Sequence, residues 1–301
     1  MEKPLVSFIV VSYNHSAFLT ECLDSIYNQT YKNWELIIAD DASTDNSSDI
    51  SKNWINKYNL SVETNFHTEN RGFATTLNEC LELAKGKYVN IIAADDYLHP
   101  DFLTKCVNSL ESKDDSYGMV FSSAFLLNED SSISNYHQDF SFYKNAIQFR
   151  KELKKLNYVS ALGTLVKKNV LIETGLYDSN ILIEDYDRWL RINEKYLIDF
   201  VPMNLGYYRK HAENISTLKQ RTIAVEEVLL RMKYDGDLEN RLKINNDIRK
   251  IYISSRDRKE LKKVSLNYKK YKGKTCWLNF CLKFRIPVKL YELKYKILNV
   301  V

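Results

Sequence analysis

Short apolar runs alternate with amphipathic segments along the first half of the chain, and this alternation constrains the fold more than any other feature. The runs are typical of buried strands and cover residues 5–11, 34–39, 62–66 and 88–94. Between them, apolar residues recur at helical spacing, as they do from Phe18 to Tyr27. Strict β-α alternation predicts an α/β domain with right-handed crossovers, in which helices flank a mainly parallel sheet.

Two pairs of adjacent aspartates stand where predicted strands end. Asp40 and Asp41 follow the second run, and Asp95 and Asp96 follow the fourth. Open parallel sheets bind ligands beyond the carboxyl ends of their strands, so these side chains are expected to line one crevice. Four carboxylates in one crevice repel each other unless a cation or a hydrogen-bond donor shares the space. The sequence therefore predicts a site for a metal and a nucleotide.

The second half of the chain is less regular. Strands are expected at 118–127, 158–166 and 200–208, with a helix near 187–196. Residues 128–142 have no clear period and are expected to form a long loop, of the kind that often serves as a lid or binds an acceptor. Beyond Thr217 the pattern becomes helical, so we expect one domain at 1–217 and a helical extension at 218–301.

Charge is distributed unevenly along the chain. Residues 251–301 contain 14 Lys and Arg against 3 Asp and Glu, whereas residues 1–250 contain 29 against 36. An acidic body with a basic tail indicates two different partners. The chain enters a strand-like run at once and has no apolar stretch near the ~18 residues that span a bilayer, so we expect a cytoplasmic protein that can lie at the inner face of the membrane. The five cysteines lack a C-x-x-C pair, which disfavours a disulfide framework and a structural zinc site, and Cys22, Cys80 and Cys106 are expected to be reduced core residues.

Six motifs, in order, resemble those of family 2 glycosyltransferases of GT-A fold. The similarity covers roughly residues 4–217. The motifs are VSFIVVSYN at 6–14, LIIADDASTD at 36–45, NRG at 70–72, ADDY at 94–97, EDYDRWLR at 184–191 and YRKHAENIS at 208–216.

The resemblance implies a nucleotide site made by Val11, Tyr13, Asn14, Asp41, Arg71 and Asp95. A carboxylate at Asp41 suits the imide N–H of a uracil base, with Ser43 and Asp45 assigned to helix capping. In the alternative, Asp40 and Asp41 also cap the next helix. Arg71 is expected to contact a phosphate or the base, with a solvated surface arginine as the alternative.

The resemblance also implies a divalent cation, Mn²⁺ or Mg²⁺, because hard cations take oxygen ligands. Asp96 is expected to be the direct ligand, while Asp95 addresses the ribose or a metal-bound water. His211 and Arg209 are expected near the pyrophosphate or metal, although His211 alternatively packs a loop. The family often has another acid two residues before the aspartate pair, and here that position is Ala93. In the alternative, the pair caps the helix after Pro100.

In the related enzymes, the aspartate at the position of Asp185 is the general base, and here it sits beside Glu184. The implied reaction is inverting transfer of a sugar from a UDP-sugar to a saccharide acceptor, lipid-linked through undecaprenyl diphosphate, in bacterial surface polysaccharide synthesis (O-antigen or capsule). In the alternative, the two acids only complement the helix dipole. Other readings are a catalytically inactive sugar-binding relative and a sugar-nucleotide pyrophosphorylase, although the latter's glycine-rich phosphate loop is missing near the first strand.

The basic tail mixes aromatic, aliphatic and cationic residues in a way that suits an anionic membrane surface. Its apolar members are Trp277, Leu278, Phe280, Leu282, Phe284, Ile286, Val288, Leu290, Tyr291 and Leu293, and its cations are Lys283, Arg285, Lys289 and Lys294. The alternative is a partly helical extension packed on the catalytic domain. Nucleic acid is not expected as a partner, because the body is acidic and no binding motif occurs.

Overall fold

The computed structural model describes residues 3–130, 132–137, 139–235, 237–254 and 258–291. The chain divides into two compact units. The first comprises Met1–Leu153 with Asn157–Asn214, and the second comprises Lys154–Leu156 with Ile215–Val301.

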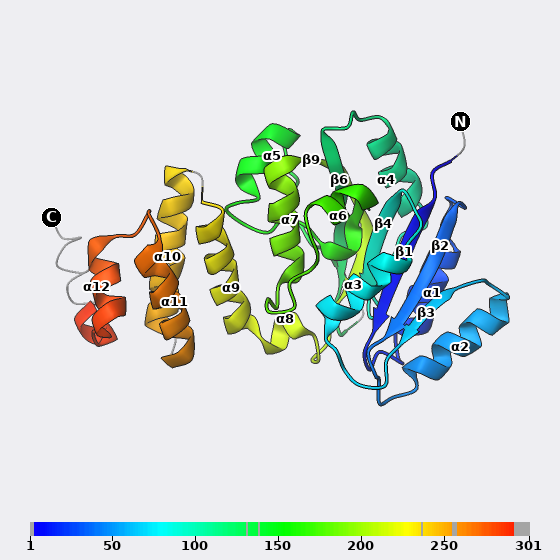
Figure 1. Cartoon of the computed structure of the whole chain (residues 1–301), viewed down its shortest axis with the longest axis horizontal. Coiled ribbons are helices and arrows are strands. Elements are labelled where there is room, and N and C mark those ends of the chain that lie inside the picture. Colours follow the sequence, from blue (N-terminus) through cyan, green and yellow to red (C-terminus); the bar gives the residue numbers. More distant parts are fainter. Residues whose placement is uncertain (1–2, 131, 138, 236, 255–257, 292–301) are drawn as a thin grey trace. The chain divides into compact units, whose positions relative to one another are not determined.

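A single mixed sheet organises the first unit (Figure 1), with strand order β3-β2-β1-β4-β8-β6-β9-β5 and β7 paired to β6. Its strands are β1 (Val6–Ser12), β2 (Trp34–Asp40), β3 (Glu63–Phe66), β4 (Tyr88–Ala93), β5 (Tyr97–Leu98), β6 (Tyr117–Leu127), β7 (Ile133–Asn135), β8 (Thr164–Lys167) and β9 (Leu197–Arg209). The helices of this unit are α1 (Leu19–Tyr27), α2 (Ser47–Tyr58), α3 (Phe73–Leu83), α4 (Phe102–Glu111), α5 (Ala146–Glu152), the 3-10 turn η1 (Ala161–Gly163), α6 (Lys168–Glu173) and α7 (Glu184–Lys195).

The predicted β-α alternation is confirmed in the first half of this unit. Strands β1, β2, β3 and β4 pair in parallel, and their register places Ser12 opposite Asp40 and Val11 opposite Ala93. All seven residues of β1 are buried, as a strand covered on both faces requires. The carboxyl ends of β1, β2 and β4 therefore meet at one edge of the sheet.

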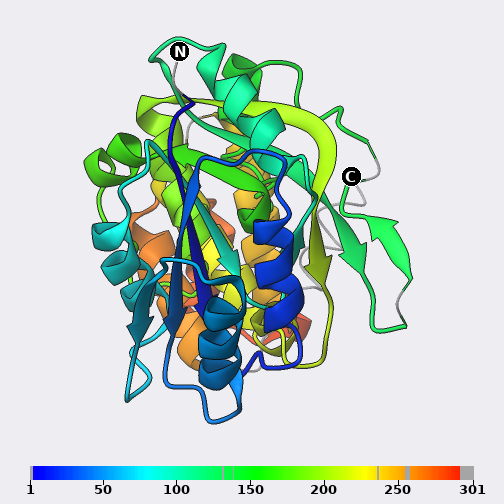
Figure 2. The ribbon, with the colours of Figure 1, turned by 90° about the vertical axis from the view of Figure 1, so that its right-hand side faces the viewer.

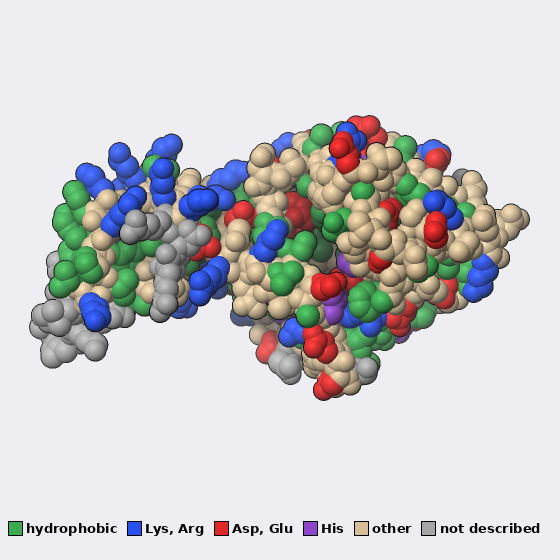
Figure 3. Space-filling view, turned by 90° about the horizontal axis from the view of Figure 1, so that it is seen from below, with side chains coloured by type: hydrophobic (Ala, Val, Ile, Leu, Met, Phe, Trp, Pro, Cys, Tyr) green, Lys and Arg blue, Asp and Glu red, His purple; other side chains and the backbone are tan. Residues whose placement is uncertain are grey.

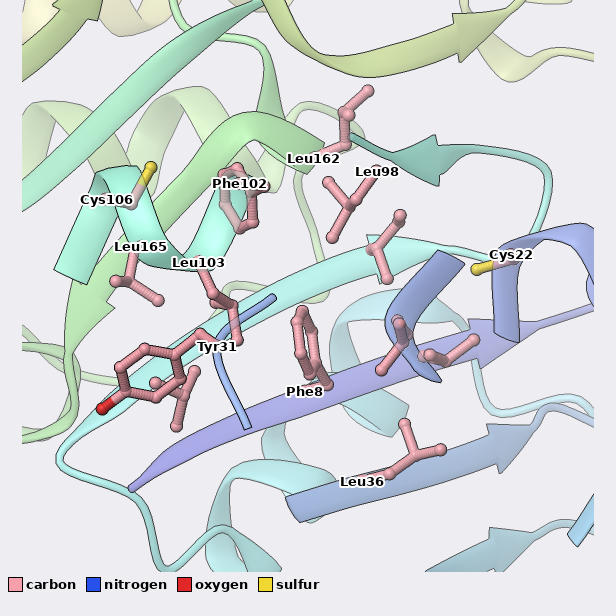
Figure 4. Packing of buried hydrophobic residues seen from close by; sticks show 14 of the residues in the cluster. Phe8, Cys22, Tyr31, Leu36, Leu98, Phe102, Leu103, Cys106, Leu162 and Leu165 are labelled. Atoms are coloured by element: carbon pink, nitrogen blue, oxygen red, sulfur yellow. The ribbon is translucent and has the colours of Figure 1, made fainter. Parts of the chain in front are cut away.

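The core lies between the sheet and its helices. On one face, α1 and α4 pack their apolar stripes onto β1 and its neighbours, and Figure 4 shows Cys22 of α1 and Leu103 of α4 in the same buried cluster as Phe8 of β1. Cys22, Cys80 and Cys106 are buried and free, as expected of reduced core residues. The helix α3 contacts β1, β2 and β3.

The second half of the sheet is not parallel throughout. β8 runs antiparallel between β4 and β6, and β5 is antiparallel to β9, whereas β6 and β9 are parallel. The expected loop at 128–142 contains the strand β7, which forms a hairpin with β6 at the right of Figure 2. Its end is anchored, because the Phe142 ring stacks on Tyr158 at 4.8 Å and packs on Phe200 at 5.3 Å. Aromatic packing therefore fixes the end of this segment.

The second unit is helical and has its own core. Its helices are α8 (Ile215–Leu218), α9 (Gln220–Lys233), α10 (Leu238–Ser254), α11 (Arg258–Lys270) and α12 (Cys276–Phe284). Residues 154–156 belong to it, because Lys155 Nζ donates to Glu239 at 2.5 Å and the Lys155 carbonyl accepts from Arg231 at 3.2 Å. Within the described ranges, no helix has the length and apolar character needed to cross a membrane.

Candidate active site

Hydrogen bonds within two neighbouring loops shape the edge of the sheet beyond β1 and β2. Asp40 accepts from the Ser43 N–H at 2.8 Å and from its hydroxyl at 2.6 Å. Ser43 Oγ in turn accepts from the backbone N–H of Asn14, a residue with a φ of +57°. Asp45 bonds the N–H of Ser47, the first residue of α2, and also the N–H of Ser16. Ser43 and Asp45 therefore join the two loops. Asp45 also bonds an N–H at the start of α2, whereas Ser43 does not cap this helix as expected, because its hydroxyl is engaged by Asp40 and Asn14 and the N-cap residue is Asn46.

Asp41 is buried and satisfied by three donors. The N–H groups of Arg71 and Gly72 reach its carboxylate at 2.8 and 2.9 Å, and His67 Nδ1 lies 2.8 Å away. Burial raises the pKa of Asp41, but these hydrogen bonds outweigh it and hold the pKa below its ordinary value. Gly72 has a φ of +86°, which an L side chain rarely adopts. The predicted neighbours Asp41 and Arg71 are thus brought together through the Arg71 backbone.

Of the other nucleotide contacts expected at this edge, Val11 is buried and Tyr13 is 45% exposed. The Val11 carbonyl accepts from the Ala94 N–H at 3.0 Å, which extends the pairing of β1 with β4 by one residue. Tyr13 and Asn14 directly follow β1, on the same side as Asp41. At this edge a nucleotide would meet the exposed ring of Tyr13 and the carboxylate of Asp41, next to the buried strand end at Val11.

The second aspartate pair follows β4 and faces the end of β9. Asp96 Oδ1 accepts from the Arg209 N–H at 2.9 Å, and the Arg209 Nε donates to the Asp95 carbonyl at 3.0 Å. Asp95 Oδ2 lies 3.1 Å from His211 Nε2 and 3.8 Å from His15 Nε2. Figure 3 shows acidic and histidine side chains together on one face of this unit. His211 thus contacts Asp95 rather than Asp96.

The chemistry of this pair fits a divalent cation. Burial and the neighbouring charge of Asp95 raise the pKa of Asp96 well above its ordinary value, against the opposing effect of Arg209. A cation beside two such carboxylates would relieve the repulsion, and Mg²⁺ or Mn²⁺ needs only one or two carboxylates when phosphates and water complete its shell. In the part of the chain that the structure describes, no group of three or more His, Cys, Asp or Glu is arranged to hold a metal by itself. The residues therefore suit an ion shared with a phosphate ligand.

Asp185 and Glu184 begin α7, as predicted, and Asp185 lines a cavity of about 180 Å³ together with Asp96. Asp185 accepts from the Tyr186 N–H at 2.6 Å. Burial raises the pKa of Asp185, although hydrogen bonds from the Tyr186 backbone and the Asn157 side chain oppose this rise. A partly buried carboxylate with a raised pKa is suited to accept a proton.

The cavity also has walls that the sequence did not single out. Those with polar side chains are Tyr136, Asn157, Ser160 and Tyr208. Tyr208 directly precedes Arg209 in the YRKHAENIS motif, which is a signal that could have found it. Tyr136 lies in the loop at 128–142, which was expected to serve as a lid or to bind an acceptor, but no pattern singled out this residue within the loop. The structure also brings His15, to which the sequence gives no role, beside Asp95. Burial and the charges of Asp96 and Asp95 raise the pKa of the Cys22 thiol well above its ordinary value, which disfavours a reactive thiolate.

Comparison with known proteins identifies the family of the chain. The model of the family "Glycosyl transferase family 2" matches residues 7–175. The glycosyltransferase MJ1057 of Methanocaldococcus jannaschii, which is uncharacterized, is 29% identical over 216 residues, covering 69% of this chain and 72% of that protein. The chain spans only 33% and 35% of the length of two other curated relatives that it matches.

Solved structures show the same fold. S. aureus TarS 1-349 in complex with UDP-GlcNAc superposes with a TM-score of 0.65 at 16% identity, covering 88% of this chain and 81% of that one. The mannosyltransferase PcManGT from Pyrobaculum calidifontis, in complex with GDP-Man and Mn²⁺, superposes with a TM-score of 0.59 at 19% identity, covering 100% of this chain and 81% of that one. The matched family model, together with the fold, shows that the chain belongs to glycosyl transferase family 2 and has the GT-A fold.

Proposed function

We propose that residues 1–217 catalyse inverting transfer of a sugar from a UDP-sugar to a saccharide acceptor in polysaccharide synthesis. The observation that supports this most is the cavity shared by Asp96 and Asp185. Asp185, a carboxylate with a raised pKa, and Asp96, from the aspartate pair that follows β4, both line it. The nucleotide-sugars in the TarS and PcManGT structures support a nucleotide-sugar donor.

Asp185 acts as the general base in this proposal. It takes the proton of the acceptor hydroxyl while that oxygen attacks the anomeric carbon from the face opposite the nucleotide, which inverts the configuration. Asn157 orients the carboxylate through a hydrogen bond, and Tyr136 and Tyr208 bound the space in which the sugars meet. Asp41, Arg71 and the residues after β1 hold the nucleotide.

A divalent ion would be held by Asp96, with His211 as a further ligand through a ring nitrogen. When bound, it neutralises charge on the departing diphosphate. Arg209 supports this end of the site by bonding both aspartates, through Asp96 Oδ1 and the Asp95 carbonyl. Its guanidinium also lies 4.7 Å from the Phe18 ring and pairs with Glu21, so its position is fixed.

The test is release of nucleoside diphosphate from UDP-, dTDP- and GDP-sugars, with UDP affinity measured alongside. Asp185→Asn is expected to lower turnover by about 10²–10⁴-fold and to leave UDP affinity within about twofold. Asp49→Asn is the matched control, because that side chain is 76% exposed on α2. An Asp185→Asn variant with normal turnover would refute the assignment. UDP binding without turnover of any donor in the wild type would instead support an inactive sugar-nucleotide-binding relative.

The lipid-linked acceptor is supported by the charge of the second unit. Within its bounds the sequence has 24 Lys and Arg against 9 Asp and Glu, whereas the first unit has 19 against 30. At the left of Figure 3, blue cationic side chains lie beside green hydrophobic ones on this unit. A surface of this kind suits an anionic membrane, where a lipid-linked saccharide would be found.

The structure corrects which tail residues could contact a membrane. Leu278, Leu282 and Tyr291 lie in the core of the second unit and are unavailable, because α12 packs against α10 and α11. The exposed apolar side chains are Phe280, Phe284 and Leu290, at 44%, 55% and 56%. Leu293 and Lys294, which belonged to the expected surface, lie outside the described residues.

Co-sedimentation with vesicles tests this contact. Truncation at Thr275 would remove core residues of the second unit, so point variants are preferable. We expect the wild type to bind vesicles containing phosphatidylglycerol but not neutral ones, less strongly at high salt, and a Phe280→Ser, Phe284→Ser double variant to bind several-fold less. Leu242→Ser on α10, which replaces a side chain that is 59% exposed, is the control. Equal binding by the double variant would remove the proposed surface.

A further inference from the structure

His67 lies between two carboxylates at the edge of the candidate nucleotide site. Its Nδ1 is 2.8 Å from Asp41 Oδ1, and its Nε2 is 2.7 Å from Glu79 Oε2 on α3. The ring is only 6% exposed. Its backbone N–H donates to the Asp40 carbonyl at 2.9 Å, which continues the β2–β3 pairing and fixes the residue in place.

Both contacts require donors on the imidazole ring. A neutral imidazole carries one N–H, so its second nitrogen would present a lone pair to a carboxylate oxygen. The charged ring donates at both ends. Burial alone lowers the pKa of His67, but the hydrogen bonds to Asp41 and Glu79 outweigh burial and raise the pKa above its ordinary value. The geometry therefore describes an imidazolium held between two ionised carboxylates.

Glu79 connects this ring to Arg71. While Oε2 faces His67 and accepts from Asn65 at 2.8 Å, Oε1 accepts from the Arg71 guanidinium at 2.7 Å. Arg71 thus donates hydrogen bonds from both its side chain and its backbone, because its backbone N–H donates to Asp41. Asp41, His67, Glu79 and Arg71 alternate in charge and form one closed ring of contacts.

These contacts leave the Asp41 carboxylate able to accept one further hydrogen bond. An ionised carboxylate has about four lone-pair positions, and Arg71, Gly72 and His67 fill three of them. A donor on the nucleotide can take the last. Because three donors fix the carboxylate plane, that last position points in one direction.

We propose that His67, as an imidazolium, is a positioning residue that orients Asp41 toward the imide N–H of a uracil base and, through Glu79, holds Arg71 at the same nucleotide. This inference rests on the proposed function. The charged groups that face His67 are Asp41 and Glu79, with Arg71 behind Glu79. When the ring loses its proton, Asp41 loses one of its three donors. Affinity for the base is therefore present below the raised pKa and falls as the pH rises through it.

The experiment compares UDP with its N3-methyl derivative, which lacks the imide N–H but carries the same diphosphate. The ratio of their affinities, measured by calorimetry between about pH 6 and pH 8.5, isolates the base contact from phosphate ionisation and spans the range in which histidine titrates. For the wild type we expect UDP to bind about tenfold to a hundredfold more tightly, with the ratio declining as the pH rises.

Two variants and a control probe the ring. Gln carries no charge and has both of its N–H donors on one nitrogen, so His67→Gln cannot reproduce donors at both ring positions. The ratio should fall below about threefold and no longer vary with pH. Glu79→Gln removes one of the two carboxylates that favour the charged ring, so the decline should move to lower pH. Glu82→Gln, three residues along α3 and exposed, should match the wild type. If His67→Gln does not fold, the shift in Glu79→Gln decides.

An unchanged ratio and pH profile in the His67→Gln or Glu79→Gln variant would overturn the positioning role while leaving the proposed function intact. Equal wild-type affinity for the two nucleotides would overturn the contact between Asp41 and the base, and with it this inference. A wild type that binds no nucleoside diphosphate would remove the proposed function itself.

Discussion

Replacing Asp45 with alanine is expected to separate the loops that carry the residues after β1. Its carboxylate accepts from the Ser47 N–H at 2.9 Å, from the Ser47 hydroxyl at 2.6 Å and from the Ser16 N–H at 2.9 Å. Burial raises the pKa of Asp45, but these hydrogen bonds outweigh it and lower the pKa from 3.8 to about 2. The folded state therefore favours the ionised form.

The size of the effect follows from this pKa. One pKa unit corresponds to about 1.4 kcal/mol, so a fall from 3.8 to about 2 corresponds to roughly 2.5 kcal/mol. Because Asp45 is partly exposed, solvent screening reduces that figure, and we expect Asp45→Ala to lower the free energy of unfolding by about 1–2 kcal/mol at pH 7. UDP affinity should also fall a few-fold, since Tyr13 and Asn14 lie in the loop that Asp45 tethers through Ser16.

Urea unfolding of the wild type, Asp45→Ala and the exposed control Asp49→Ala measures this difference at several pH values. A carboxylate with a lowered pKa contributes stability above its unfolded pKa and loses it as the pH falls through the folded value. The difference between wild type and Asp45→Ala should therefore shrink between about pH 4 and pH 2. A difference that persists undiminished at pH 2, or one no larger than that of Asp49→Ala at pH 7, would refute the reasoning.

Three further outcomes are expected. Turnover should fall as the pH decreases through the raised pKa of Asp185, at a higher pH than for an ordinary aspartate, because the base must be ionised; a pH–rate profile checks this. Gly72→Ala should destabilise the fold by about 1–2 kcal/mol in urea unfolding, since the strain comes from its φ of +86° and not from crowding. Asp96→Asn should keep or raise the melting temperature, because it removes repulsion from Asp95, while abolishing any Mn²⁺-dependent gain in UDP affinity measured by calorimetry.

The first half of the fold could be predicted because its signals are local. Continuous apolar runs such as β1 and β4 arise when a strand is covered on both faces, and crossovers have one hand. These rules bring Asp41 and Asp96 to the same edge without knowledge of any contact. The antiparallel strand β8 between β4 and β6 could not be foreseen, because strand order depends on pairing between residues far apart in the sequence.

The hydrogen-bond partners and the pKa of each carboxylate could not be predicted from the sequence. The expectation that a cation or hydrogen-bond donors must share space with the aspartates is met differently at the two pairs. Asp40 and Asp41 are satisfied by backbone N–H groups, a serine and His67, whereas Asp96 stays buried beside Asp95 with a raised pKa. Nothing in local spacing distinguishes DD at 40–41 from DD at 95–96.

The sequence by itself determined the α/β class, the family and the edge where the candidate site forms, because periodicity and motif order are properties of the chain alone. Only the tertiary structure decided that Asp185 and Asp96 line one cavity and that His67 lies between Asp41 and Glu79. The physical reason is that hydrogen bonds, burial and pKa depend on which distant side chains meet. These contacts are determined by how the sheet and helices pack together.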